Sequence, residues 1–220
     1  MADPTPQTPD PLQTPDSPQT PEPPHAPVAP QHTRGDLPPH VRTLVGFTLV
    51  KLDEIIDAVG ALDDATANAV PPAPGANSPF VLLTHCLGMM RRWSSTVNLG
   101  IRVPRDREAE FSAIGRVADL LVSAAEVRAA FLADLTATDW NSPPVAPATG
   151  YGPWSQSTFG VLLHVFEELC QHLGHLEITL DLLRAAELRA DDHCAPGHRA
   201  PDHQAAGHRA DDLRGGNDPA

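Results

Sequence analysis

Apolar residues recur at helical spacing in four segments of the central part of the chain. The approximate ranges of these segments are 38–61, 78–100, 115–135 and 157–186. Within each segment the apolar positions follow one another at intervals of three and four residues, which places them on one face of an α-helix. Proline and glycine clusters separate the segments, and Ser78 and Pro79 form an N-cap and first-turn pair. The pattern predicts an all-α fold, a four-helix bundle.

The two ends of the chain lack this pattern. Residues 1–37 repeat Thr-Pro and Gln-Thr-Pro units, and residues 189–220 repeat a short unit that contains His and Asp. Neither segment has enough apolar surface to offset the entropy of ordering. The histidines of the C-terminal segment have no structure to orient them, so a solvated tail is expected there rather than a specific metal site. We expect a disordered arm over 1–37, a folded domain over 38–188 and a disordered tail over 189–220.

Composition argues against several classes of partner. The formal net charge is −13 at pH 7 and no basic stripe interrupts it, so nucleic acid is not an expected partner. The chain has neither a signal-peptide pattern nor an apolar run near the ~20 residues that span a bilayer, so no membrane partner and a cytoplasmic location are expected.

Cys86, Cys170 and Cys194 form an odd set without Cys-x-x-Cys spacing, which fits a reducing compartment. Cys86 and Cys170 are interpreted as small buried hydrophobes rather than as metal ligands.

The fourth segment contains a polar stripe beside its apolar face. Its core-facing positions are Leu162, Val165, Leu169, Leu176, Leu180 and Leu183. On a helical wheel, His172 lies nearest the centre of that face, Glu168 is next, and His164 and His175 lie furthest out. Glu168 and His172, one turn apart, can therefore point to one place at the edge of the core. His164 and His175 are expected to support that pair or to be structural.

A third ligand for a metal ion would have to come from another helix. His85 lies among apolar residues in the second segment, "LLTHCLGMM", where an unpaired polar group would be costly. By periodicity alone, a core histidine that is hydrogen-bonded to one neighbour is the commoner explanation. The acid and imidazole of the fourth segment, taken together with His85, favour a metal site.

These residues also carry a resemblance to a known family. The segment from His40 to Arg184 resembles the DinB-like superfamily of metal-binding four-helix bundles, especially its branch near mycothiol-dependent enzymes. The resemblance rests on "LLTHCLGMMRRW" in the second segment, "RDREAEF" before the third, and "LLHVFEELCQHLGHLEITLDLLR" in the fourth. It implies a DinB-type bundle that holds a divalent metal, and it covers neither end of the chain.

The resemblance implies His85, Glu168 and His172 as the metal ligands. Two positions depart from the family pattern, since many members have a histidine in place of Glu168 and the branch commonly has an aspartate in place of Glu177. Zinc accepts two histidines and one carboxylate, so the first departure is compatible with a zinc site. Zinc is the expected metal, and nickel and iron remain alternatives because both also accept these ligands.

Three protein ligands leave one coordination position open, which is typical of a reactive metal site. The related enzymes use the metal to bind a low-molecular-weight thiol, and a divalent cation stabilises the thiolate form. The resemblance therefore implies a metal-dependent thiol S-transferase, with mycothiol as cosubstrate and a small electrophile as partner, acting in detoxification. A mycothiol-dependent isomerase, a non-catalytic metal-binding bundle with an interaction or stress role, and a metal-free bundle remain alternatives. A homodimer is left open.

Two further features are expected near such a site. The loop from Trp140 to Trp154 is unusually aromatic for a connection, and long loops inside compact domains are often functional. We expect it to line or cover the mouth of the site. Arg91, Arg92 and Arg102 are candidates to meet an anionic cosubstrate, and the alternative for each is an ordinary solvated arginine.

Overall fold

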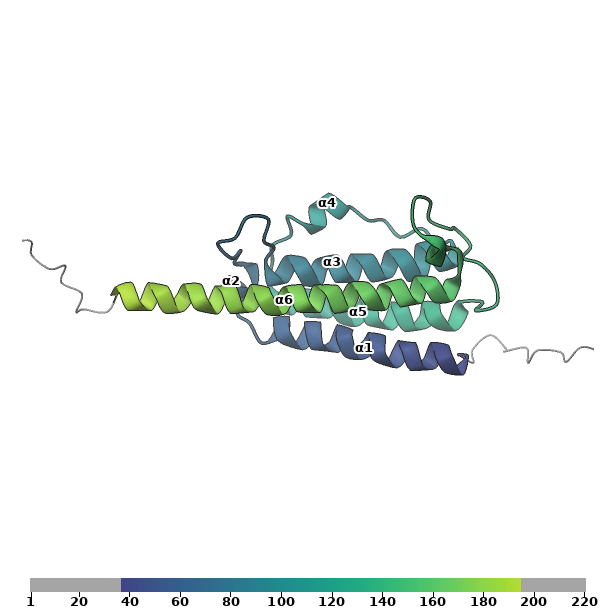
Figure 1. The fold of residues 1–220 in the computed structure, drawn as a ribbon, viewed down its shortest axis with the longest axis horizontal. Helices are drawn as coiled ribbons and strands as arrows, with labels where there is room; N and C mark the ends of the chain where they lie inside the picture. Colours follow the sequence, from purple (N-terminus) through teal and green to yellow (C-terminus); the bar gives the residue numbers. More distant parts are fainter. Residues whose placement is uncertain (1–36, 195–220) are drawn as a thin grey trace, which may run out of the picture.

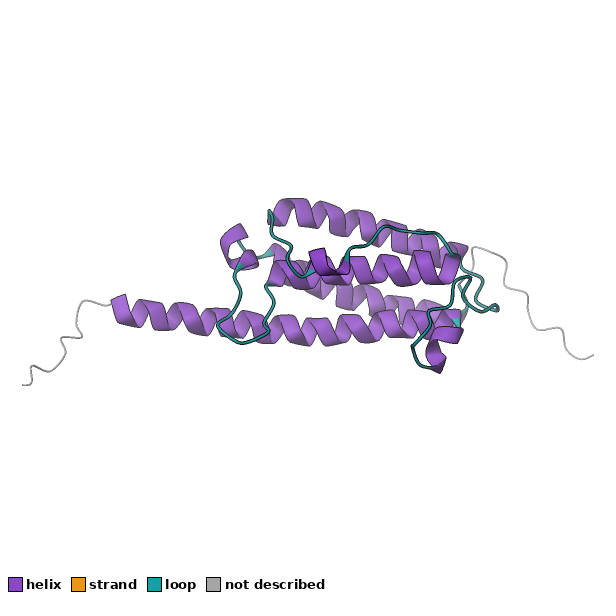
Figure 2. Ribbon diagram, turned by 90° about the horizontal axis from the view of Figure 1, so that it is seen from above, coloured by secondary structure: helices purple, strands orange, loops and turns teal. Residues whose placement is uncertain are grey.

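The structure, a computed structural model, describes residues 37–194 of the chain. The expected disordered arm over 1–37, apart from Leu37, and most of the expected tail over 189–220 lie outside the described residues. The described part is helical and contains no strand, so the predicted all-α fold is confirmed (Figure 2). Its α-helices are α1 (Pro39–Gly60), α2 (Asp64–Asn68), α3 (Pro79–Arg91), α4 (Arg107–Glu110), α5 (Val117–Ala137) and α6 (Thr158–Cys194). A π-helix, η1 (Arg92–Asn98), continues α3, and a 3-10 helix, η2 (Pro153–Gln156), precedes α6.

Local sequence signals explain where α3 begins and where η1 ends. The side chain of Ser78 accepts a hydrogen bond from the backbone N–H of Val81, and Pro79 occupies the first helical position. At the other end, Gly100 follows η1 with a φ of +70°, a left-handed conformation that glycine adopts without a steric cost. The predicted N-cap pair is therefore confirmed.

The long helices α1, α3, α5 and α6 form the bundle. α1 packs against α5 and α6, and α3 packs against the same two helices (Figure 1). Asn68 in α2 exchanges two hydrogen bonds with the backbone of Gly115, and Asp64 accepts one from the backbone of Val117. These contacts hold the start of α5 at the end of the bundle where α3 begins. α3 and α5 therefore run in the same direction, and residues 99–116 form a long crossing segment over α3.

The core lies between the four long helices. The largest fully buried side chains are Phe131, Leu52, Ile55, Leu82, Leu83, Met89, Met90, Leu135, Leu162, Leu169, Leu176 and Val41. All six core-facing positions expected in α6 are buried. Burying one such side chain contributes roughly 1.5–3 kcal/mol, so this apolar seam is the main favourable term holding the bundle together.

Three features of the helices differ from the expectation. The second segment is not one α-helix, because its last seven residues form the π-helix η1. The crossing segment contains α4, a single turn whose N-cap Asp106 accepts hydrogen bonds from the backbone of Glu108 and Ala109. α6 does not end near residue 186 but continues to Cys194, so the first residues of the expected tail are helical. No described helix is long and apolar enough to cross a membrane.

The extension of α6 has a local cause. It projects beyond the other helices of the bundle, and Leu188 within it is 68 % exposed (Figure 1). Its sequence, "AAELRADD", is dominated by Ala, Glu, Leu and Arg, which have high intrinsic helix propensity. Tertiary packing ends with the bundle, but nothing in the sequence stops the helix there.

Candidate metal centre

His85, Glu168 and His172 come together between α3 and α6. One ligand atom from each residue lies within 4.8 Å of the others. His85 is 5 % exposed, and its ring is 4.8 Å from the ring of His172, centroid to centroid. Two histidines and a carboxylate at this spacing are a donor set that zinc accepts. The three residues expected from the sequence are therefore neighbours in space.

Glu110, from the crossing segment, orients the ring of His85. The distance between His85 Nδ1 and Glu110 Oε2 is 3.0 Å, and the Glu110 side chain is buried. A carboxylate only accepts hydrogen bonds, so His85 Nδ1 carries the proton and donates it. His85 Nε2 is then deprotonated and able to bind a cation. A carboxylate that fixes the tautomer of a histidine in this way is the usual support of a metal-binding histidine.

Arg105 holds Glu110 in place with two hydrogen bonds. Its Nε donates to Glu110 Oε1 at 2.6 Å and its Nη2 donates to Glu110 Oε2 at 2.7 Å. This paired geometry is the strong form of an arginine–carboxylate contact. Gly88, one turn after His85 along α3, makes room for the acid, because a Cβ atom at residue 88 would collide with Glu110 Oε1 and Cδ.

On α6, Glu168 lies between two histidines of the same helix. Its Oε2 is 3.5 Å from His172 Nε2, and its Oε1 is 3.6 Å from His164 Nε2. His172 Nδ1 is buried and has no hydrogen-bond partner among the described residues. A buried imidazole nitrogen without a partner is costly, so the position of His172 fits a site that gains a ligand.

The ionisation states of the site suit a cation. Burial lowers the pKa of His85, which outweighs the opposing effect of its hydrogen bond to Glu110 and keeps the ring neutral. The hydrogen bond from His172, helped by the nearby rings of His164 and His85, lowers the pKa of Glu168 despite partial burial. A metal ion needs a neutral imidazole and an ionised carboxylate, and the protein favours both.

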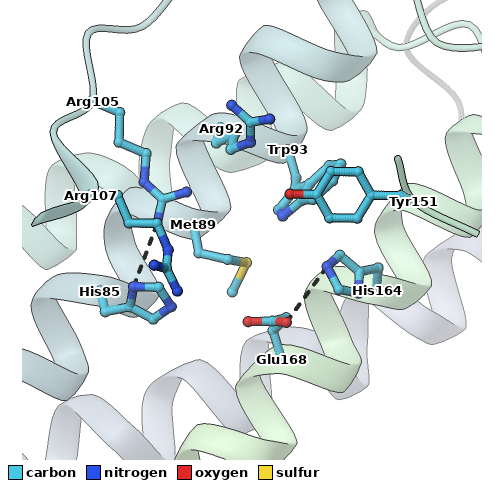
Figure 3. Close-up of a pocket in the computed structure, with 9 residues that line it drawn as sticks. All are labelled: His85, Met89, Arg92, Trp93, Arg105, Arg107, Tyr151, His164 and Glu168. Carbon is cyan, nitrogen blue, oxygen red and sulfur yellow. Dashed lines mark hydrogen bonds and ion pairs between the residues drawn. The ribbon is translucent and has the colours of Figure 1, made fainter. Parts of the chain in front are cut away.

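A pocket of about 470 Å³ opens beside His85 and Glu168 (Figure 3). Its lining residues are His85, Met89, Arg92, Trp93, Arg105, Arg107, Tyr151, His164 and Glu168. The volume is within the range of small-molecule sites. The two residues of the triad that line it are therefore accessible to a ligand of that size.

Aromatic rings cover one side of this pocket. Trp154 stacks on His164 with 4.0 Å between ring centroids, and Trp93 meets Tyr151 edge to face at 5.1 Å. Tyr151 lines the pocket, so the expectation that the aromatic loop borders the site is confirmed for this residue. Trp140 does not line the pocket, and its indole N–H donates to the backbone oxygen of Leu135.

His164 is less peripheral than the helical wheel predicts. Its side chain is 13 % exposed and that of His172 is 15 % exposed, although the wheel places His164 further from the core. The reason is Trp154, which the loop before α6 folds onto the His164 ring. His175, the other outer histidine, has its ring 6.4 Å from that of His172. The wheel considers one helix alone and cannot include such a cover.

Of the three arginines expected to meet an anion, only Arg92 lines the pocket. Arg91 instead forms an ion pair with Asp134, with 2.8 Å between Nη1 and Oδ2. Arg102 is exposed and is not among the pocket residues. Arg105 and Arg107, which no helical periodicity assigns to the site, border the pocket from the crossing segment.

Neither Cys86 nor Cys170 is part of the site. Cys86 is fully buried, and burial raises the pKa of its thiol well above the usual range. Cys170 is half-buried on α6, and burial raises its pKa as well. Both thiols stay protonated, which makes them poor nucleophiles and poor metal ligands. The interpretation of Cys86 as a small buried hydrophobe is confirmed.

Comparison with known proteins identifies the family. The profile of the DinB superfamily matches residues 51–176, a range that includes all three residues of the triad. A crystal structure of a conserved protein from Enterococcus faecalis has a similar fold, with a TM-score of 0.52 and 14 % sequence identity over 66 % of this chain and 96 % of that one. No curated protein gives a significant match to the chain. The family match covers more than half of the sequence, and the chain belongs to the DinB superfamily.

Proposed function

We propose that the protein is a metal-dependent thiol S-transferase, in which His85, Glu168 and His172 hold a divalent ion. Zinc is the metal proposed ahead of nickel and iron. The observation that carries the proposal is the convergence of these three ligand atoms within 4.8 Å beside an open pocket. The partnerless Nδ1 of His172 and the hydrogen bond that frees Nε2 of His85 both support it. A divalent ion bound there would stabilise a thiolate at neutral pH, which is the form that attacks an electrophile.

The chain itself contributes position and environment. Glu110 and Arg105 keep His85 in one tautomer and one orientation. His164, which is stacked against Trp154, contacts Oε1 of Glu168. The other carboxylate oxygen, Oε2, lies on the side of His172. Aromatic rings at one side of the pocket exclude water around a bound thiol and its electrophile. Mycothiol is the proposed thiol, since the segments around the triad resemble the mycothiol-dependent branch.

Metal binding is tested first, by comparing the full-length protein with its His172→Ala and His175→Ala variants. All three keep the C-terminal histidines, so any zinc bound there is common to them. We expect the His172→Ala variant to bind about one zinc ion per chain less than the other two, since one ligand of three is lost. Equal zinc content in the three proteins would show that the triad does not hold the metal.

The thiol reaction is tested on the cobalt-loaded protein. Adding mycothiol should produce a sulfur-to-metal charge-transfer band, and the zinc-loaded protein should accelerate thiol addition to a model electrophile. The His172→Ala variant should lose both effects and the His175→Ala variant should keep them. A protein that binds one ion at the triad but shows neither effect would be a non-catalytic metal-binding bundle.

A further inference from the structure

Two arginines at the pocket have no acidic partner within residues 37–194, the part of the chain that the structure describes. The guanidinium of Arg105 is occupied by Glu110 through two short hydrogen bonds. Arg92 and Arg107, in contrast, make no ion pair with any side chain that the structure describes. Each guanidinium lies over the face of an aromatic ring, with 5.5 Å from Arg92 Cζ to the Trp93 centroid and 5.0 Å from Arg107 Cζ to the Phe111 centroid. Stacking of this kind orients a guanidinium and leaves its N–H groups at the edge free to donate.

The two arginines reach one pocket from different elements. Arg92 begins η1 and Arg107 begins α4, and both line the pocket that His85 and Glu168 border. Figure 3 shows Arg105 and Arg107 on the left of the pocket, Arg92 at its top beside Trp93, and Tyr151 on the right. The fold thus brings together positive charges that are separate in the sequence, in a chain whose net charge is −13.

The acid of the pocket does not balance these charges. Glu168 is in contact with His164 and His172 on its own helix, and it is the carboxylate of the triad. Glu110 is paired with Arg105. Positive charge in a partly enclosed pocket raises the local concentration of anions even when the whole protein is acidic. A guanidinium matches the oxygen pairs of carboxylates and phosphates in geometry as well as in charge.

We propose that the small molecule that occupies this pocket carries an oxyanion, a carboxylate or a phosphate, which Arg92 and Arg107 bind while its carbon skeleton contacts Trp93 and Tyr151. This inference deepens the proposed function, because it states the chemical class of the substrate that meets the triad. The anion is held by arginines and the reacting group lies toward His85 and Glu168, so the pocket has two chemically different ends.

The experiment measures binding of three related probes to the metal-free, full-length protein by calorimetry. The probes are 3-phenylpropionate, phenethyl phosphate and the uncharged 3-phenylpropionamide, and the metal is removed so that no anion can bind to it. We expect at least one anion to bind roughly tenfold more tightly than the amide, because hydrogen bonds to charged groups are the stronger kind. The preferred anion decides between a carboxylate and a phosphate substrate.

Arginine variants locate the anion. Arg92→Gln together with Arg107→Gln should remove the preference for the anion and leave binding of the amide unchanged. Arg102→Gln together with Arg116→Gln is the matched control, since it removes the same two charges from exposed arginines of the crossing segment that do not line the pocket. The inference is overturned if neither anion binds more tightly than the amide, or if the control loses the preference to the same extent. The first comparison uses the unmodified protein, so it decides even if a variant folds poorly.

Failure of this inference and failure of the proposed function give different results. Absence of an anion preference in the unmodified protein, together with normal zinc binding at the triad, would overturn only the oxyanion subsite. A clear anion preference in a protein whose zinc content does not depend on His172 would overturn the metal-dependent function and leave an anion-binding pocket.

Discussion

A histidine that binds a metal must present one ring nitrogen without a proton, and Glu110 determines which nitrogen of His85 that is. The acid lies on a different element from His85 and is itself held by Arg105. Arg105 thus contacts Glu110, and Glu110 contacts His85, so the crossing segment is connected to the triad by hydrogen bonds. The neutral amide of glutamine can still reach His85 but cannot bind Arg105 and His85 with the strength of a carboxylate.

We predict that Glu110→Gln weakens zinc binding by about 10- to 100-fold, the usual cost of losing such a supporting group. The protein should remain folded, because the substitution keeps the shape of the side chain. A competition titration with a chromophoric chelator measures the change in affinity.

Glu108→Gln is the matched control for this prediction, since Glu108 is an exposed acid of the same helical turn. Its zinc affinity should equal that of the unmodified protein. An unchanged affinity in Glu110→Gln would show that His85 does not depend on its carboxylate partner.

Gly88 allows a second test, of how closely Glu110 packs against α3. A methyl group added there would overlap the carboxylate of Glu110, so Gly88→Ala should displace the acid and destabilise the fold by roughly 1–3 kcal/mol, as overpacking does. Gly46→Ala in α1 is the control, because nothing lies within 4 Å of the added atom. It should stabilise the protein by about 0.5–1 kcal/mol through helix propensity. Urea unfolding measures both, and equal effects of the two substitutions would contradict the close packing at Gly88.

Sequence alone predicts some of these residues and not others, for physical reasons. His85, Glu168 and His172 lie on long amphipathic helices, where periodicity and family resemblance both indicate them. Glu110 and Arg107 lie in a connection without periodicity, so no pattern assigns them a direction. Gly88 has no side chain, and its importance follows from the position of another residue.

At the scale of elements, the π-helix η1 positions part of the pocket wall. Arg92 and Trp93 belong to it and line the pocket. The buried carboxylate of Asp134 on α5 holds η1 in position. It accepts hydrogen bonds from Ser94 and Ser95 in η1 and from Arg91, the residue that precedes η1. π-helical turns are frequent at functional sites, and this one contributes two of the pocket residues.

We predict that Asp134→Ala destabilises the protein by about 1–3 kcal/mol, the cost of leaving buried donors without their acceptor. It should also change the near-UV circular dichroism of the tryptophans, since Trp93 lies next to the freed serines. Asp53→Ala is the control, because the ion pair of Asp53 with Arg128 is more exposed. Exposed pairs contribute about 0–1 kcal/mol, so little change is expected. Equal losses in the two variants would show that Asp134 does not anchor η1.

The sequence predicts the helices better than their ends. Four periodic segments become four long helices, because burial of an apolar face is what both the pattern and the fold depend on. The spacing of apolar residues changes too little between α3 and η1 for the sequence to predict the π-helix. The continuation of α6 to Cys194 depends on helix propensity beyond the core, where the apolar pattern gives no information.

At the scale of the whole molecule, stability should depend on pH through the site. The pKa of His85 is lowered from 6.5 in the folded state by burial, with Glu110, Arg105 and His172 as the charged or titratable groups around it. The unfolded chain therefore binds more protons than the folded one as pH falls below about 6.5, and the free energy of unfolding decreases. Glu168, whose pKa is lowered from 4.5, should add a second loss at lower pH.

We predict that the metal-free protein loses stability between about pH 6.5 and the lowered pKa of His85, and that His85→Gln has a flatter profile over that interval. Urea unfolding at a series of pH values, in the presence of a chelator, measures the difference between the two proteins. Parallel profiles would show that His85 is not held neutral in the fold.

The separation of the three ligands along the chain affects the order in which the molecule assembles. His85 and Glu168 are about eighty residues apart, and the loop between them must close before their side chains can meet. We therefore expect α3 and α6 to be packed before the ion meets all three ligands, and we do not expect the ion to nucleate folding. Its arrival is a late step, so the rate of metal capture by refolding chains should follow the formation of native packing rather than of helices.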